Sequence, residues 1–435
     1  MSETAVEPLG QQPDPLEEAR DAVSEPFTDV YHNPRESSSR MGLEARAYAY
    51  RAGASLAFGM GNMVSPAVPS PHMTVYLDST FSKQYSGKDK IRAYVWTPDR
   101  PRMGSRKGSK ESADPRSRRP AVINFHGGGF VLGQGTDDGR WAMAVMQALG
   151  AVVFSVEYRL APGYPFPTPV EDCADAVLQI WRRADEFWID RDRIMVSGFS
   201  AGGTLALASW VLLADYKRWG YEIKPDPDLA KGMSELSVDD TGDDDTSAKG
   251  QDGKADPKVP QLAGLMLFYP LLDWTQSRPR KRLTCSKPEF TLSRTLTDLF
   301  DASYLYPYEE VKSQLDNPLL SPGLMPDDLL DRLPPVQLCL CEYDMLLAEG
   351  RRFYERLQAR KKESGAREVE KAKHAWDKPS GLLYSPPESM GIEYGEAVRV
   401  MAGWIGREEG NGSGEDLSQR EREREEQGNL RHPEA

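Results

Sequence analysis

The sequence predicts an α/β fold in which a mostly parallel sheet is covered by helices on both faces. Short, almost continuously apolar segments alternate with longer amphipathic segments along most of the 435 residues. Apolar runs of this length are typical of strands buried on both faces, and helices between them predict parallel crossover connections. The length suits one large α/β domain as well as several smaller ones.

The strands are expected where β-branched, aromatic and aliphatic residues gather. The first two, rich in Val, Tyr and Trp, form an early pair, and the later ones are apolar runs that each precede a helical pattern. The expected strands are residues 73–77, 91–96, 121–125, 151–156, 193–197, 262–269, 336–341 and 368–372.

The helices are expected where apolar residues recur every three or four positions. The first would lie on an apolar surface before the early strand pair, and the others would connect successive strands of the sheet. The expected helices are residues 43–63, 140–149, 170–181, 203–215, 345–360 and 394–405.

Charge divides the chain into a near-neutral body and three acidic segments. The formal net charge is −13, which argues against a general nucleic-acid binder. Residues 1–40, 225–258 and 407–435 carry −6, −6 and −4 and lack apolar periodicity. We therefore predict a disordered N-terminal tail, a disordered insertion and a charged C-terminal tail around one domain at residues 41–406.

A basic stretch at residues 99–120 is interpreted as a solvated loop, with a docking site for an acidic partner as the alternative. The four cysteines are too few and too scattered for a disulfide framework. Cys339 and Cys341 alternate in an apolar run, so they are expected to be buried on one strand rather than to bind a metal.

Targeting signals are not apparent in the sequence. The N-terminus has neither the basic nor the apolar region of a signal peptide, and no apolar run reaches the roughly 18 residues of a membrane span. These features predict a soluble, cytoplasmic protein without an integral membrane segment. They do not predict its oligomeric state.

A candidate nucleophile lies between an expected strand and an expected helix. Residues 198–202 read GFSAG, in which Gly198 and Gly202 flank Ser200 at a spacing of two. The apolar run 193–197 ends directly before this motif and the helical pattern 203–215 begins directly after it. A G-x-S-x-G motif at such a turn is typical of a nucleophile elbow.

A serine hydroxyl needs a neighbouring base, and only five histidines are present. His32 and His432 lie in the tails, and His72 and His126 precede the serine. In this architecture the order is serine, acid, histidine. His374, just after the last expected strand, is therefore the candidate base.

The acid that orients the base should follow a strand between the serine and the histidine. The run 336–341 ends in Glu342-Tyr343-Asp344, and both acids are candidates. Asp344 is favoured because it should already lie in the turn, whereas Glu342 is still beside the strand. Asp273, after an earlier strand, is a third possibility.

A glycine-rich segment follows the strand 121–125. Glycines allow the main chain to approach a ligand, so the amides of Gly127 and Gly128, with that of Ala201, are expected to form an oxyanion hole. Gly129 completes the segment. It lacks the spacing of phosphate-binding loops. His126 is expected to brace this loop rather than to transfer protons.

Together these motifs resemble the hormone-sensitive-lipase-like branch of the α/β-hydrolases, a group of carboxylesterases. The resemblance covers residues 121–376 and implies an eight-stranded sheet with an antiparallel second strand. It also implies a small helical cap, here near residues 43–68 and 275–322. Its motifs are HGGGF at 126–130, YRLAPGYPFP at 158–167, GFSAGG at 198–203, Asp344 and His374.

Three positions depart from the family pattern. Phe199 stands where the family often has Asp or Thr, Gly163 replaces a carboxylate, and Trp376 replaces a phenylalanine. Phe199 is expected to narrow the acyl side of the pocket and Trp376 the alcohol side. Phe130 is a further candidate for substrate contact.

The leading hypothesis is a serine carboxylesterase that cleaves small to medium acyl esters through an acyl-enzyme on Ser200, without cofactor or metal. The size preference comes from the resemblance alone. Amide, lactone or acyl-transfer chemistry would use the same acyl-enzyme and is the alternative. A non-catalytic small-molecule receptor on the same fold is a third hypothesis, which the retained His374 disfavours.

Overall fold

The computed structural model describes residues 39–64, 69–82, 90–98, 118–224, 258–378 and 386–406 of the chain. The segments predicted to be tails, acidic insertion and basic loop lie almost entirely outside the described residues. They are residues 1–40, 225–258, 407–435 and 99–120.

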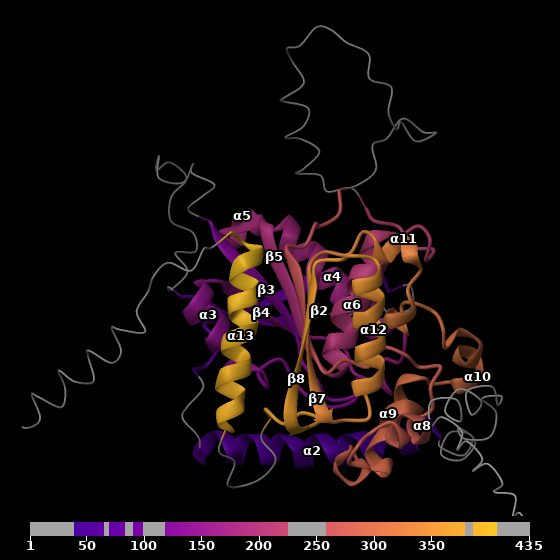
Figure 1. The fold of residues 1–435 in the computed structure, drawn as a ribbon. Coiled ribbons are helices and arrows are strands. Elements are labelled where there is room, and N and C mark those ends of the chain that lie inside the picture. Colours follow the sequence, from indigo (N-terminus) through magenta and orange to yellow (C-terminus); the bar gives the residue numbers. More distant parts are fainter. Residues whose placement is uncertain are drawn as a thin grey trace, which may run out of the picture.

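An eight-stranded sheet occupies the centre of the molecule (Figure 1). Its strands are β1 (Met73–Asp78), β2 (Lys90–Trp96), β3 (Arg119–Phe125), β4 (Val152–Glu157), β5 (Ile189–Phe199), β6 (Gly264–Phe268), β7 (Val336–Tyr343) and β8 (Ser364–Lys373). Their order is β1-β2-β4-β3-β5-β6-β7-β8. β2 pairs antiparallel with β1 and β4, and the remaining neighbours pair in parallel. The predicted α/β fold with an antiparallel second strand is confirmed.

Two strands extend beyond their apolar centres. β5 begins at Ile189, before an Asp-Arg-Asp-Arg run in which Arg193 Nε donates to Asp190 Oδ2 at 2.8 Å. β8 lies at the sheet edge with β7 as its neighbour, and half of its residues are exposed. Charged residues are common on an edge strand such as β8. The charged ends of β5 and β8 lie outside the apolar runs, so the apolar pattern did not predict them.

Helices cover both faces of the sheet (Figure 1). Residues from α3 and α13 pack with one apolar cluster, and residues from α4, α6 and α12 pack with the other. α6 is buried along nearly its whole length because it lies against the central strands. The bounds are α3 (Gly139–Leu149), α4 (Thr168–Arg182), α6 (Ala201–Ala214), α12 (Leu347–Ala359) and α13 (Glu388–Trp404).

A further group of helices lies across one end of the sheet (Figure 1). Here α2 (Arg40–Val64) contacts α9 (Arg294–Tyr304), and α8 (Arg278–Leu283) lies beside α9. The guanidinium of Arg51 on α2 donates to the carbonyls of Val131 and Ala161, both at 2.8 Å. α8 and α9 lie within the predicted cap position 275–322, and α2 overlaps the other one at 43–68. The division into cap and body stays a prediction. Shorter elements are α5 (Ala184–Phe187), α10 (Tyr308–Val311), α11 (Asp327–Leu330), η4 (Pro288–Phe290), η5 (Lys312–Gln314) and η6 (Pro322–Leu324).

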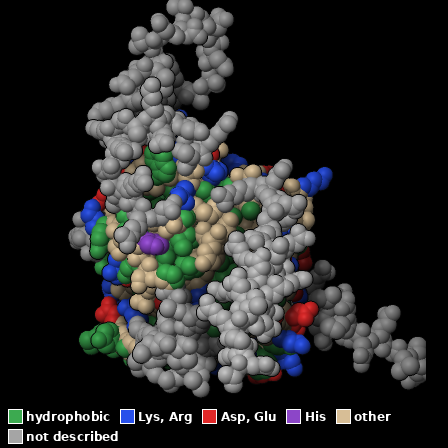
Figure 2. Space-filling view, turned by 90° about the vertical axis from the view of Figure 1, so that its left-hand side faces the viewer, with side chains coloured by type: hydrophobic (Ala, Val, Ile, Leu, Met, Phe, Trp, Pro, Cys, Tyr) green, Lys and Arg blue, Asp and Glu red, His purple; other side chains and the backbone are tan. Residues whose placement is uncertain are grey.

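One face of the molecule is of mixed character. Figure 2 shows hydrophobic and uncharged atoms in the middle of one face, with basic and acidic side chains interspersed around them. Among the described residues, no helix combines the length and apolarity needed to cross a bilayer.

Candidate active site

Ser200 occupies a sharp turn between β5 and α6. Its φ of 54° lies in the left-handed region, where a residue with a side chain is strained by about 1–3 kcal/mol. Its amide donates to Phe268 O at 2.8 Å, which holds the turn against β6. The strand-to-helix turn thus presents the serine side chain at the end of the sheet.

The two glycines of the motif are required by close backbone packing. A Cβ on Gly198 would lie 2.2 Å from the carbonyl oxygen of Gly202, and one on Gly202 would lie 2.0 Å from that of Phe125. Real Cβ atoms do not approach carbonyl oxygens this closely. The spacing of the motif therefore reflects the contact of β5, α6 and β3 around Ser200.

The hydroxyl of Ser200 lies within hydrogen-bonding distance of His374. Ser200 Oγ and His374 Nε2 are 2.7 Å apart, although 174 positions separate the residues. His374 follows β8 and is buried. The edge of its ring also contacts Tyr269, with 4.9 Å between the ring centroids.

The other ring nitrogen of His374 is bound by Asp344, the first residue after β7. Nδ1 and Asp344 Oδ2 are 2.6 Å apart. The second carboxylate oxygen accepts the amide of Leu346 at 3.0 Å, which fixes the acid in its turn. This pairing gives the imidazole one defined orientation and leaves Nε2 facing the serine hydroxyl.

The competing acids are engaged elsewhere. Glu342 Oε2 accepts the amide of Lys371 at 2.6 Å, on the edge strand β8. Asp273 accepts the amide of Thr275 at 2.9 Å within its own turn. Asp344 is therefore the acid that the fold brings to His374.

The glycine loop after β3 lies beside Ser200. A Cβ on Gly127 would be 3.5 Å from Ser200 Cβ, and Gly128 has a φ of 112° at which its Cβ would overlap Leu132 O. Ala201 is the first residue of α6, and the first amides of a helix donate no hydrogen bond within the helix. The amides expected to face a substrate oxygen thus come from segments that meet at the serine.

His126 contacts the loop in the manner expected of a brace. Its Nδ1 donates to Gly127 O at 2.7 Å, and its ring stacks on Tyr158 with centroids 4.3 Å apart. The hydroxyl of Tyr158 donates to His126 O at 2.8 Å. Burial raises the pKa of Tyr158 well above its ordinary value, so this hydroxyl stays a donor.

A family model described as alpha/beta hydrolase fold matches residues 122–378, more than half of the chain. The chain belongs to this family. The match covers the glycine loop, the serine motif, Asp344 and His374, and it confirms the resemblance to the hormone-sensitive-lipase-like branch.

Curated relatives of the chain include several proteins named as esterases. An arylesterase from Saccharolobus solfataricus is 39% identical over 102 residues, which cover 23% of this chain and 33% of that protein. Esterase LipI from Mycobacterium tuberculosis is 28% identical over 247 residues, which cover 56% of this chain and 61% of that protein. The matches thus span between a third and about three fifths of these relatives' own length.

Solved structures share the fold over most of the length of this chain. An esterase from Pyrobaculum calidifontis is 24% identical, with a TM-score of 0.56 over 84% of this chain and 94% of that one. A bacterial heroin esterase is 22% identical, with a TM-score of 0.58 over 83% of this chain and 92% of that one.

The structure corrects the role predicted for Phe199. Its ring is fully buried and stacks on Phe268 at 4.3 Å, within the cluster that α3 and α13 cover. Side chains alternate across a strand, so the residue before Ser200 points into the sheet's packed face. The prediction that Phe199 lines the acyl pocket is wrong.

The other two candidates for substrate contact lie in different surroundings. Phe130 is 1% exposed and stacks on Tyr304 of α9, with ring centroids 3.7 Å apart. Trp376 is partly buried against the cluster below α13. Contact of Phe130 and Trp376 with a substrate stays a prediction.

Sequence reasoning missed a set of buried polar residues next to His374. Asp377 is 3% exposed and accepts hydroxyl hydrogen bonds from Tyr269 and Tyr394. It also pairs with Lys378. Adjacent acidic and basic residues after a strand normally indicate a solvated loop, so no local signal in the sequence marks these side chains as buried.

Proposed function

We propose that the chain is a serine carboxylesterase in which Ser200, His374 and Asp344 form the catalytic triad. The observation that supports this most directly is the continuous chain of short contacts, 2.7 Å from Ser200 Oγ to His374 Nε2 and 2.6 Å from His374 Nδ1 to Asp344 Oδ2. The esterase names of the relatives support the same reaction class.

In the proposed first step Ser200 Oγ attacks the carbonyl carbon of the ester while His374 Nε2 takes its proton. Asp344 holds the imidazole through Nδ1 and stabilises the positive charge that forms on it. The amides of Gly127, Gly128 and Ala201 donate to the oxygen that becomes negative. His374 then gives the proton to the leaving alcohol, and the acyl group stays on Ser200.

In the second step a water molecule replaces the alcohol. His374 takes a proton from this water as it attacks the acyl carbonyl, and the same amides bind the oxyanion again. The proton returns to Ser200 Oγ as the carboxylic acid leaves. The same groups thus serve both halves of the reaction.

Contacts beside the glycine loop favour small to medium acyl groups. A Cβ on Gly129 would lie 2.1 Å from the ring of Phe300, so α9 lies directly against the loop. Phe130 and Tyr304 stack between the same two segments. Aromatic side chains therefore occupy the space next to the proposed oxyanion hole.

The test is a hydrolysis assay of the full chain on p-nitrophenyl esters of increasing acyl length. We expect the fastest turnover on short and medium acyl groups and a loss of about 10⁴-fold or more in Ser200→Ala. Ser313→Ala, at an exposed serine of η5, is the matched control and should keep the wild-type rate. An unchanged rate in Ser200→Ala would contradict the proposal.

A further inference from the structure

Lys378 lies four residues after His374, and its side chain is directed inward with 13% of its surface exposed. Its ammonium lies 2.7 Å from Asp138 Oδ1 and 2.9 Å from Asp377 Oδ2. Both carboxylates are buried. One cation therefore joins the end of the histidine turn to the residue that precedes α3.

Asp377 ties the same turn to two further elements. It accepts the hydroxyl of Tyr269, after β6, at 2.5 Å and the hydroxyl of Tyr394, on α13, at 2.6 Å. Tyr269 is also the residue whose ring contacts His374. The position of the imidazole is thus coupled to this carboxylate through one tyrosine.

Asp138 continues the network towards the glycine loop. It stands at the N-cap of α3, but its side chain makes no capping hydrogen bond. Instead it accepts the side-chain amide of Asn124, on β3, at 2.8 Å. Asn124 in turn accepts the hydroxyl of Ser197, on β5, at 2.8 Å. The network therefore reaches the two strands that lead into the loop and the nucleophile turn.

The ammonium of Lys378 also covers the residue before the nucleophile. It lies 3.4 Å from the centroid of the Phe199 ring. A cation over an aromatic face is attracted by the ring quadrupole, and more strongly when it is withdrawn from water. The contact with Lys378 explains why an aromatic residue stands at position 199. The predicted role in the acyl pocket does not explain it.

The ionic character of the network is maintained despite burial. Burial alone would lower the pKa of Lys378, but Asp138 and Asp377 outweigh it and the pKa lies above its ordinary value. Burial would likewise raise the pKa of Asp377, but Lys378 and the two tyrosines outweigh it and the pKa is lowered. Both groups are therefore charged at neutral pH.

We propose that Lys378 is a positioning residue that holds the histidine turn, the nucleophile turn and the strand of the glycine loop in one arrangement. The inference rests on the proposed function, since it assigns a role in aligning His374 with Ser200. Displacement of a reacting group by about 1 Å costs on the order of 100-fold in rate. The network therefore affects kcat, while substrate binding depends on other contacts.

The experiment replaces Lys378 by methionine, which has a similar length and no charge. We expect kcat on p-nitrophenyl butyrate to fall about ten- to a hundred-fold, with KM within about threefold of wild type. The rate constant for phosphonylation of Ser200 by a fluorophosphonate should fall by a similar factor. Folding is checked by near-UV circular dichroism.

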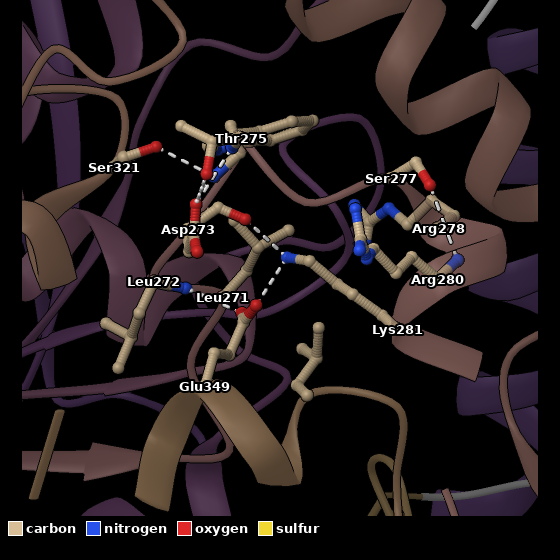
Figure 3. Close-up of polar contacts among 12 residues, drawn as sticks. Leu271, Leu272, Asp273, Thr275, Ser277, Arg278, Arg280, Lys281, Ser321 and Glu349 are labelled. Atoms are coloured by element: carbon tan, nitrogen blue, oxygen red, sulfur yellow. Dashed lines mark hydrogen bonds and ion pairs between the residues drawn. The ribbon is translucent and has the colours of Figure 1, made fainter. Parts of the chain in front are cut away.

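A second buried lysine provides a matched control (Figure 3). Lys281 of α8 contacts Glu349 Oε2 and Asp273 O, each at 2.5 Å. In the part of the chain that the structure describes, Lys281 has no hydrogen bond or ion pair with Ser200, Asp344 or His374. Lys281→Met should lower the free energy of unfolding but keep kcat and the phosphonylation rate within about twofold.

Three kinetic results would each overturn the inference. One is a folded Lys378→Met variant with wild-type kcat and phosphonylation rate, and another is an equal loss of kcat in Lys281→Met. If Lys378→Met does not fold, Phe199→Leu removes the ring and keeps the ion pairs. It should lower kcat about three- to tenfold at similar KM, and an unchanged kcat is the third result.

A readout without turnover separates this inference from the proposed function. The proton on His374 Nδ1, bonded to Asp344, should give a low-field proton resonance that is absent from His374→Gln. Lys378→Met should shift or broaden this resonance and Lys281→Met should not. Absence of ester hydrolysis in the wild type contradicts the proposed function alone, whereas an unaltered resonance in Lys378→Met contradicts the positioning role.

Discussion

Two acids lie at the end of β7, and the structure distinguishes their roles at the scale of single residues. Asp344 contacts His374, whereas Glu342 accepts a backbone amide of β8. We expect Asp344→Asn to lower kcat on p-nitrophenyl butyrate by about 10²- to 10⁴-fold, because an amide cannot stabilise the charged imidazole. Glu342→Gln is the matched control, within about twofold of wild type. A greater loss in the control would reassign the acid.

A second residue, Asp137, links stability to pH. It accepts the amide of Gln134 at 3.0 Å, and burial raises its pKa to about 6. The unfolded chain releases this proton near pH 4, so the folded chain binds the extra proton between about pH 4 and pH 6. The contribution of Asp137 to the free energy of unfolding therefore decreases as pH rises through this window and is constant above about pH 7.

Urea unfolding of wild type and Asp137→Asn at several pH values measures this contribution. Relative to wild type, the variant should gain about 2 kcal/mol between pH 4 and pH 8, because asparagine has no proton to lose. Parallel stability curves across this range would show that the carboxyl has an ordinary pKa in the folded chain.

At the scale of elements, a buried ion pair joins α8 to α9. Arg278 Nη2 lies 2.9 Å from Asp301 Oδ1, and both side chains are almost fully buried. Arg278→Met alone removes the Arg278 cation from a buried carboxylate and should cost about 3–5 kcal/mol in urea unfolding. Arg278→Met combined with Asp301→Leu should cost clearly less. Equal losses in the two variants would mean that packing, rather than charge, joins these helices.

Elements with buried apolar sequences were predictable, and those defined by tertiary contacts were not. The apolar run at residues 121–125 makes up the C-terminal five residues of β3, and all five are buried. Helices α8 and α9 lie in a segment without a continuous apolar run, so only the family resemblance indicated a cap there. Only half the length of β8 was predicted, because the rest of this charged edge strand has no apolar run.

The candidate site shows the same division. The motif around Ser200 and the strand-end position of Asp344 are local signals, and few histidines were available to complete them. The direction of Phe199 and the burial of Lys378 depend on which neighbours the fold supplies. Adjacent sequence contains no signal for either, because the partners lie on distant elements.

At the scale of the whole molecule, the parallel strands bring segments far apart in the sequence to one end of the sheet. β3, β5, β7 and β8 precede the glycine loop, Ser200, Asp344 and His374. Functional residues gather at such an edge because the loops that follow parallel strands meet there. The α/β-hydrolase fold thus accounts for the contact between residues 174 positions apart.

We propose that Ser200 is a nucleophile activated by His374. The most direct test of this proposal is peptide mapping by mass spectrometry after reaction of the full chain with a fluorophosphonate. We expect one adduct per chain, on Ser200, with loss of ester hydrolysis in proportion to labelling and a much slower reaction in His374→Gln. An enzyme that hydrolyses esters while the adduct forms on another residue, or on none, would contradict this role of Ser200.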